Sequence, residues 1–444
     1  MKTKTILLAA LFTSLAGFSQ KQWTLKECVN HALKNNISVK QNKLNVQLAQ
    51  KDVAIAKGNF LPDLNGSSTS SFNSGLSPDR TGVLQNTQNI RSSFDLSSRG
   101  SVFNGFRNIN TKKQAQLGVE GSKLDLEVIE NDISLNVVNT YLNVLFAKEN
   151  LSVAETQAEI SKKQIERAQA QFEAGAIPKG DLLNVQSTSA NDFQNVVTQQ
   201  NTLNLALLRL SQFLQIPFEG FDVERIETVL PSIALLYKNS NEVYQKALSE
   251  RPEIKKSKLD IENANLSIDL AKGAYLPTVN YFLGMSTSYV HQFNNLFQGQ
   301  SNEYFFKQVL KDRINYNLGL SINVPIFNRF QTKNRVAKSK ISKEQSEFAL
   351  ENQKLQLRQT IEQAFLDAKA AAKTYEAAKI SLEAQKEAFK NAQVSYDYGS
   401  MTQFDFDQVR NRLVNAEGAM IRAKYDYVFR TKVLKFYYGE SIVD

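Results

Sequence analysis

The chain contains one sequence pattern twice. Residues 32–65 align without a gap on residues 247–280, at a constant shift of 215 positions. A second block follows in each half at a shift of 224 positions. Matched residues include Gly58 with Gly273, Pro62 with Pro277, Phe103 with Phe327, Gly175 with Gly399 and Asp181 with Asp405. A self-match of this length indicates a tandem duplication, so the two halves are expected to share one architecture.

The N-terminus has the pattern of a secretory signal. A basic start at Lys2 and Lys4 precedes a short apolar run, and the small residues Gly17 and Ser19 follow it. The apolar run is far too short to cross a bilayer, so the pattern predicts a signal peptide over residues 1–19 that is cleaved after Ser19. Phe18 stands where a lipoprotein would carry its modified cysteine, and no lipid anchor is expected.

The composition argues against several classes of function. Cys28 is the only cysteine and the chain has two histidines, His31 and His291, so no disulfide, Ser/His/Asp set, metal cluster or phosphate loop can be assembled, and no cofactor is expected. Cys28 and His31 are three residues apart, and a structural pair is favoured over a metal site. The net charge of +9 is dispersed and is not organised in basic runs with aromatics, which disfavours nucleic-acid binding.

Each half is expected to open with a helix that ends at a proline signal. The helical stretches cover residues 25–59 and about 242–275, and Pro252 marks the start of a new helix within the second stretch. Both end in a Gly-x-aromatic-Leu-Pro sequence, at residues 58–62 and 273–277. Proline ends the helix and favours an extended chain after it.

The segments that follow have the alternation of β-strands. In the later strand, expected over residues 315–326, apolar side chains alternate with small polar ones over the ~9 to 11 residues that a tilted strand needs to cross a bilayer. The residues expected to face lipid are Tyr316, Leu318, Leu320, Ile322 and Val324. The first-half strands, 64–72 and 91–103, alternate weakly, and polar connections are expected at 74–89 and 291–312. A half-buried sheet in a soluble domain remains an alternative on the strands alone.

Two very long helices favour membrane strands over a half-buried sheet in a soluble domain. Residues 111–172 and 332–398 contain no proline, and at ~1.5 Å per residue each helix would be about 90 to 100 Å long. A four-three spacing of apolar residues from Leu124 to Leu145 predicts a coiled-coil seam. Matched turns at Gly175 and Gly399 precede returning helices, from Asp181 to about 214 and from Asp405 to about 436.

Four membrane strands cannot close a barrel alone, because open edges are not tolerated in lipid and bacterial barrels begin at eight strands. The chain must therefore oligomerise, with two copies giving eight strands and three giving twelve. The helical hairpins of the copies would then form a tube in the periplasm.

These residues resemble the TolC-like outer membrane efflux proteins, also called the outer membrane factor family. The resemblance rests on the opening residues 23–36, the two Leu-Pro helix stops, residues 324–328 before the second long helix and the turn with its aspartate at 175–186. It implies an α+β membrane protein in the outer membrane: a homotrimer with a twelve-stranded barrel, a periplasmic helical tunnel, and docking to a periplasmic adaptor and an inner-membrane pump. The family often has a Gly-Gly pair after the strands, where this chain has Gly105-Phe106 and Arg329-Phe330.

The sequence divides into nine expected segments: signal peptide 1–19, N-terminal segment and first helix 20–60, first strand pair 61–103, first long hairpin 104–214, equatorial connector 215–249, second-repeat helix 250–276, second strand pair 277–327, second long hairpin 328–438 and tail 439–444.

The resemblance also gives two candidate sites. The adaptor would dock on the two turns, at Gly175, Ala176, Ile177, Gly399, Ser400 and Met401. A gate near the turns would include Asp181, Tyr396, Asp405 and Asp407, although an aspartate in the first turn of a helix is also a common cap. A basic residue common in the family's gate is replaced here by Met401.

Two rival classes differ from a channel in their sequence pattern. A periplasmic adaptor would carry one helical hairpin flanked by lipoyl-like β segments, and a secreted enzyme would need a set of catalytic residues. The duplicated hairpins and the alternation at residues 316–326 favour the channel. The cargo is not determined by the sequence.

Overall fold

The computed structural model describes residues 22–78, 82–225, 237–293 and 304–442. The expected signal peptide lies outside these residues. The chain forms two compact units. We call residues 1–44, 123–256 and 350–444 the helical unit, and residues 45–122 and 257–349 the sheet unit.

The first helical stretch is two helices rather than the single helix expected over 25–59. Helix α2 (Leu25–Asn35) and helix α3 (Ile37–Gly58) are separated by Asn36, whose backbone is extended at φ −56° and ψ 134°. The Asn36 side chain accepts a hydrogen bond from the Ser38 amide at 2.9 Å. An asparagine can therefore divide a helix at a place where no proline marks the break. The second half has the same division, between α6 (Ser240–Glu250) and α7 (Pro252–Gly273), as Pro252 predicts.

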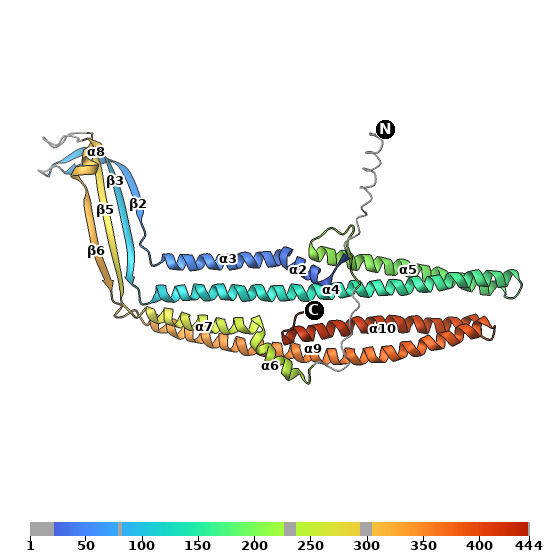
Figure 1. Cartoon of the computed structure of the whole chain (residues 1–444). Helices are drawn as coiled ribbons and strands as arrows, with labels where there is room; N and C mark the ends of the chain where they lie inside the picture. The colour runs from blue at the N-terminus through green and yellow to red at the C-terminus, as the bar shows by residue number, and fades with distance from the viewer. Residues whose placement is uncertain (1–21, 79–81, 226–236, 294–303, 443–444) are drawn as a thin grey trace, which may run out of the picture. The chain divides into compact units, whose positions relative to one another are not determined.

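The long helices confirm the expectation from the duplication (Figure 1). Helices α4 (Arg107–Glu173) and α9 (Gln331–Asp397) have 67 residues each. The returning helices α5 (Lys179–Leu214) and α10 (Gln403–Tyr438) have 36 residues each. At ~1.5 Å per residue, α4 and α9 are each about 100 Å long.

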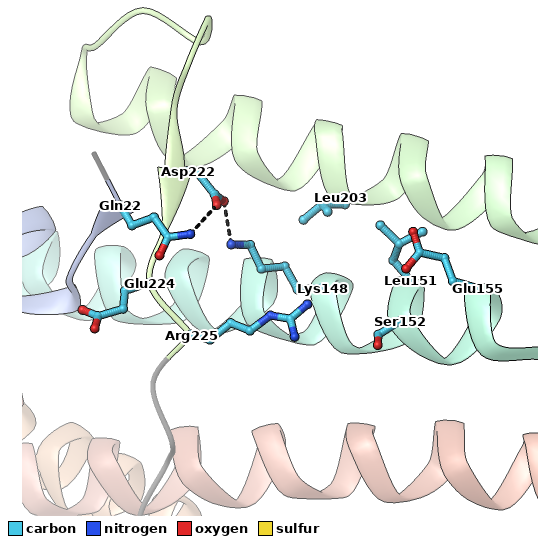
Figure 2. Close-up of a pocket in the computed structure, with 9 residues that line it drawn as sticks. All are labelled: Gln22, Lys148, Leu151, Ser152, Glu155, Leu203, Asp222, Glu224 and Arg225. Carbon is cyan, nitrogen blue, oxygen red and sulfur yellow. Dashed lines mark hydrogen bonds and ion pairs between the residues drawn. The ribbon is translucent and has the colours of Figure 1, made fainter. Parts of the chain in front are cut away.

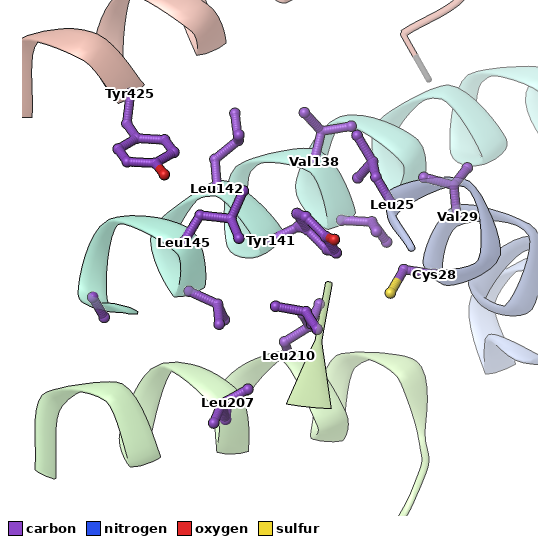
Figure 3. Packing of buried hydrophobic residues seen from close by; sticks show 14 of the residues in the cluster. Leu25, Cys28, Val29, Val138, Tyr141, Leu142, Leu145, Leu207, Leu210 and Tyr425 are labelled. Atoms are coloured by element: carbon purple, nitrogen blue, oxygen red, sulfur yellow. The ribbon is translucent and has the colours of Figure 1, made fainter. Parts of the chain in front are cut away.

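The main core of the helical unit surrounds the middle of α4, where α2 and α5 pack on it (Figure 3). Tyr141 is fully buried, and its hydroxyl donates to the Glu224 carbonyl at 2.8 Å. Val138, Leu142 and Leu145 of the expected seam are buried here. Their neighbours at 137, 141 and 144 are buried too, so this part of the helix packs over a wider surface than a coiled-coil seam.

The helical unit also contains a small parallel sheet. Strand β1 (Gln22–Trp23) pairs with β4 (Asp222–Val223).

The sheet unit contains one antiparallel sheet of four strands, in the order β2-β3-β5-β6. The strands are β2 (Asn65–Pro78), β3 (Leu84–Phe103), β5 (Thr278–Gln292) and β6 (Asn315–Asn323). A short helix α8 (Phe305–Lys307) and a π-helical turn (Gln308–Asp312) lie between β5 and β6.

Two strand boundaries differ from the expected ones. Most of the expected connection 74–89 is strand, because β2 and β3 pair as far as Pro78 and Leu84. Polar side chains support this pairing; Asn73 donates to the Asn89 side chain at 3.3 Å. At the other end of the sheet, β6 stops at Asn323, so Val324 lies beyond the strand that was expected to contain it. Pro325 has no amide to donate to a sheet, which explains this early end.

The turns at the two places where a glycine pair was expected have a left-handed backbone. Gly105 and Phe106 have φ values of 68° and 62°, and Arg329 and Phe330 have values of 55° and 60°. Left-handed backbone is unfavourable for Phe106, Arg329 and Phe330, which carry a Cβ, so these three residues are strained.

Candidate functional site

The four-stranded sheet has one apolar face and one polar face. The residue pairing places Leu320 opposite Tyr281 and Leu318 opposite Leu283, and Leu283 opposite Ser98 on the next strand. Directly opposed residues share a face, so the apolar rows of β5 and β6 coincide. The other face carries Ser321 opposite Asn280 and has the sheet's charged residues: Arg91, Asp95 and Arg99.

The apolar face is open in the single chain. Tyr316, Leu318, Leu320 and Ile322 are 67% to 79% exposed, and Val324, just beyond the strand, is 56% exposed. Exposed apolar rows of this extent mark a surface that meets lipid or a partner.

The two turns between long helices have the same backbone geometry. Gly175 and Gly399 have φ values of 75° and 72°. In each turn the glycine amide and the next amide bond back to the end of the long helix: Gly175 to Phe172 at 2.9 Å and Ala176 to Gln171 at 2.8 Å, Gly399 to Tyr396 at 3.0 Å and Ser400 to Ser395 at 2.9 Å. This is the Schellman arrangement, in which glycine supplies the left-handed residue. Among the expected docking residues Gly175, Ala176, Gly399 and Ser400 are exposed, and Ile177 and Met401 are half-buried.

Tyr396 lies in a charged environment close to the second turn. Its ring stacks on Phe406 at 4.8 Å, and its hydroxyl donates to the Gln403 side chain. The Arg167 guanidinium lies 5.6 Å from the ring centre and pairs with Asp397. Burial raises the pKa of Tyr396. The positive charge of Arg167 lowers this pKa, and the carboxylates of Asp407, Asp181 and Asp397 raise it further. The structure therefore brings Tyr396, Asp181 and Asp407 into one electrostatic neighbourhood.

Asp405 has a structural role at the start of α10. The Thr402 hydroxyl donates to the Asp405 carboxylate at 2.7 Å and accepts from the Asp405 amide at 3.2 Å. Thr402 is the N-cap of the helix, and Asp405 bonds to it from the first turn. Asp405 therefore has the helix-capping contact that was the alternative to a gate role.

Asp407 belongs instead to a buried ionic network that the sequence did not reveal. Its partner is Arg410, which is 3% exposed and joins α10 to both helices of the first hairpin. The guanidinium Nη1 lies 3.2 Å from Asp192 and donates to Ser161 at 2.8 Å. Arg410 Nε and Asp407 Oδ1 are 3.9 Å apart, and each lacks a hydrogen bond within the described residues. A buried polar group without a partner is uncommon in a native protein.

A signal for Arg410 exists in the sequence, because it lies between Phe406 and Leu413 on one helical face. A charged residue on an apolar stripe needs a buried partner. Its partner Asp192 is more than 200 residues away, so the sequence does not identify it.

A charged groove of about 560 Å³ lies beside the small β1-β4 sheet in the helical unit (Figure 2). Lys148 of α4 is its central cation. Its ammonium lies 2.6 Å from Asp222 and donates to the Val223 carbonyl at 2.6 Å. Gln22 donates to the other oxygen of Asp222 at 3.2 Å. These contacts fix the small sheet to the long helix, so they assign this groove a structural role.

Among the described residues, no helix is both long and apolar enough to cross a membrane.

A model of the outer membrane efflux protein family matches residues 28–214 and 243–440, one match for each repeat. The chain belongs to the outer membrane efflux protein family. Its members are outer membrane channels that form trimers, and they are not enzymes. The family membership excludes both rival classes, the periplasmic adaptor and the secreted enzyme.

Individual relatives of the family are distant, and two of them cover nearly the whole chain. The outer membrane efflux protein BepC of Brucella suis is 22% identical over 99% of this chain and 91% of its own length. The outer membrane protein TolC of Escherichia coli K12 is 21% identical over 97% of this chain and 86% of its own.

Solved structures of efflux channels have the same fold. The crystal structure of CusC superimposes with a TM-score of 0.77 at 18% identity, over 94% of this chain and 92% of its own. The CmeC channel of Campylobacter jejuni gives a TM-score of 0.75 at 20% identity, over 94% and 85%. The chain is thus an outer membrane efflux channel in fold, location and general function.

Proposed function

We propose that three copies of this chain form the outer membrane duct of a tripartite pump. The observation that carries the proposal is the four-stranded sheet with β2 and β6 at its edges. Unpaired edge strands are not stable in lipid, and three copies would close them into twelve strands. The apolar row Tyr316, Leu318, Leu320 and Ile322, with Val324 beyond it, would face the lipid, and the polar face would line the lumen.

The two glycine turns would be the contact with a periplasmic adaptor, which joins the channel to an inner-membrane transporter. Support comes from their matched geometry and from the exposure of Gly175, Ala176, Gly399 and Ser400. Ile177 and Met401 would add apolar contact at the rim of each turn.

A crosslinking experiment tests the docking proposal. Cys28 is buried, so a cysteine placed at Ala176 or Ser400 is the only readily accessible thiol. Crosslinks to a co-expressed adaptor are expected from both positions. A matched cysteine at exposed Lys338, in the sheet unit, should give none. Labelling of either turn cysteine by an impermeant reagent outside intact cells would refute this location.

The gate would lie near the same turns and involve Asp181, Tyr396, Asp405 and Asp407. Three copies of each carboxylate around an axis would attract cations. In planar bilayers, Asp405→Ala combined with Asp407→Ala should reduce cation selectivity and block by multivalent cations. Asp405→Asn retains a side-chain oxygen that can accept from the Thr402 hydroxyl, so it separates the loss of charge from the loss of this contact at the helix start. An unchanged current in all variants would remove these residues from the gate.

The relatives are named for different exports, so a test of the cargo must cover several chemical classes. CusC is a cation efflux protein, and AprF of Pseudomonas aeruginosa is an alkaline protease secretion protein. A deletion strain tested against a panel of drugs, metals and secreted proteins would identify it.

A further inference from the structure

Residues 304–313, which precede β6, lie at one end of the sheet (Figure 1). This segment contains α8 and the π-helical turn. The helices join the strands at the opposite end: α3 leads into β2, β3 leads into α4, α7 leads into β5 and β6 leads into α9. The segment is therefore at the strand ends farthest from these connections.

Side-chain contacts hold this segment against β5. Gln308 is 4% exposed. Its side-chain Oε1 accepts a hydrogen bond from the backbone amide of Val290 at 3.1 Å, and its side-chain Nε2 donates to the backbone carbonyl of Val290 at 3.2 Å. This part of β5 extends beyond the residues that pair with β6. The Gln308 side chain thus takes the place of a neighbouring strand. Thr287 adds a hydrogen bond to the Val309 carbonyl at 2.7 Å.

The segment lies on the apolar side of the sheet. The Phe305 ring is 5.0 Å from that of Tyr289 and 5.9 Å from that of Phe94. Side chains an even number of residues apart on one strand point to the same face. Tyr289 is six residues after Leu283 on β5, and Phe94 is four residues before Ser98, which pairs with Leu283. Tyr289 and Phe94 therefore belong to the same face as Leu283 and Leu320. Phe72, His291 and Phe293 continue the aromatic cluster across β2 and β5, with ring centres 4.9 to 6.1 Å apart.

Other apolar side chains of the segment point away from the protein. Tyr304 is 88% exposed, Phe306 72% and Leu310 63%. Such side chains on a segment fixed by Gln308 and Thr287 are available to an apolar partner.

Basic side chains lie beside this apolar surface. Lys307, Lys311 and Arg313 are exposed, and the only carboxylate of the segment is Asp312, 4.0 Å from Lys307. Lys311 and Arg313 form no ion pair with any residue in the described parts of the chain. Phe306 and Leu310 are four residues apart, as are Lys307 and Lys311, so an apolar row runs next to a basic row.

We propose that residues 304–313 anchor the channel in the outer leaflet by binding the phosphate groups of anionic lipids. Tyr304, Phe306 and Leu310 would enter the boundary between headgroups and acyl chains, where aromatic belts of membrane proteins lie. Lys307, Lys311 and Arg313 would meet the phosphates, as basic residues beside an apolar surface do at anionic membranes. Continuity with the apolar sheet face favours lipid over a protein partner. The proposal rests on the proposed function, in which that face meets lipid.

Hydrogen exchange of the trimer in nanodiscs tests this anchor. The discs contain phosphatidylcholine alone or phosphatidylcholine with lipid A, a phosphorylated glycolipid. Exchange of residues 304–313 should be slower with lipid A, and inorganic phosphate added to plain discs should not reproduce the effect. In the double variant Lys311→Gln/Arg313→Gln, the lipid A fraction needed for half protection should rise about fivefold for each charge removed, as expected for one basic residue at an anionic membrane.

Matched variants separate the two parts of the surface. Phe306→Ser/Leu310→Ser should reduce protection in both kinds of disc. Lys338→Gln/Lys340→Gln removes the same charge from exposed positions on α9 and should change nothing.

Equal exchange in both discs would overturn the anchor. The proposed lipid face is tested separately by Leu320→Arg, so a channel that inserts normally but lacks lipid A protection would refute the anchor alone. Full protection by inorganic phosphate, or protection in detergent without lipid, would also overturn it, in favour of a free phosphate site or a contact with a second copy.

Discussion

Gly105 and Gly273 touch each other through their backbones. A Cβ added to Gly105 would lie 2.2 Å from the Gly273 carbonyl oxygen, and a Cβ added to Gly273 would lie 2.5 Å from the Gly105 oxygen. The contact joins the turn after β3 to the end of α7, so it links the first repeat to the second within the sheet unit.

Gly273→Ala is therefore expected to destabilise the protein by about 1 to 3 kcal/mol, the usual cost of overpacking. The repeat supplies the control: Gly58 is the counterpart of Gly273 at the end of α3, and a Cβ there meets nothing within 4 Å. Gly58→Ala should change stability by less than about 0.5 kcal/mol. Thermal unfolding of both variants measures the difference, and equal effects would show that the backbone contact is unimportant.

Leu320→Arg should cost about 2 to 4 kcal/mol at the depth of the bilayer midplane. Ser321→Arg places the same side chain one residue further on the polar face and should be mild. Insertion and trimer formation can be followed on unheated gels of membrane fractions. If Ser321→Arg is as disruptive as Leu320→Arg, the assignment of the two faces is wrong.

Arg410→Met should destabilise the helical unit by up to about 3 kcal/mol, the lower end of the cost for a fully buried pair, because Asp192 and Asp407 are 22% and 23% exposed and would lose their cation. Adding Asp192→Asn should recover part of this loss. A double-mutant cycle by chemical denaturation measures the coupling. Additive effects of the two substitutions would mean that the 3.2 Å contact contributes little.

Glu417 gives a pH-dependent prediction. Burial raises the pKa of this carboxyl above its usual 4.5, against the opposing effects of Gln157 and Lys386. The folded state therefore holds this proton more tightly, and the group destabilises the fold increasingly as the pH rises from 4.5 through the raised pKa.

Glu417→Gln should accordingly raise the unfolding temperature at neutral pH, and the gain should shrink as the pH falls toward 4.5. Measurement of both proteins across this range tests the sign. A gain that grows at acid pH would contradict it.

Arg329→Gly should stabilise the turn after β6 by about 1 to 2 kcal/mol, since Arg329 has φ 55° and left-handed backbone is costly for residues with a Cβ. Arg335→Gly makes the same change at an exposed position within α9 and should instead lose about 1 kcal/mol. Opposite signs in thermal unfolding are the expected result; two losses would show that the surroundings relieve the strain at Arg329.

The order of helices and strands was predictable because it depends on local signals that occur twice. Pro62 and Pro277 end helices, Gly175 and Gly399 form turns, and the long runs between them lack proline. The extent of β2 was not predictable, because Ser, Asn and Gly make up most of it and only Phe72 and Leu76 are large apolar residues. The division at Asn36 was missed because its side chain, rather than a proline, ends the helix.

The candidate gate was predictable only in part. The position of Asp181, Tyr396, Asp405 and Asp407 near a turn follows from local sequence. The difference between Asp405, which caps a helix, and Asp407, which faces Arg410, depends on contacts with α4 and α5. Such contacts join residues that are far apart in the chain, and a single sequence does not specify them.

The unequal lengths of the strands have a consequence for assembly in the cell. Strand β6 pairs over nine residues, whereas β2 on the other edge has fourteen. In the proposed trimer a neighbouring copy would bond with β6 only along this shorter stretch, since the chain before it is the π-helical turn (Gln308–Asp312). The last bonds of the sheet would form between molecules in this proposed trimer, so their rate would depend on how many copies are present together. Slow export would leave exposed strand edges in the periplasm for longer, and such edges are a cause of aggregation.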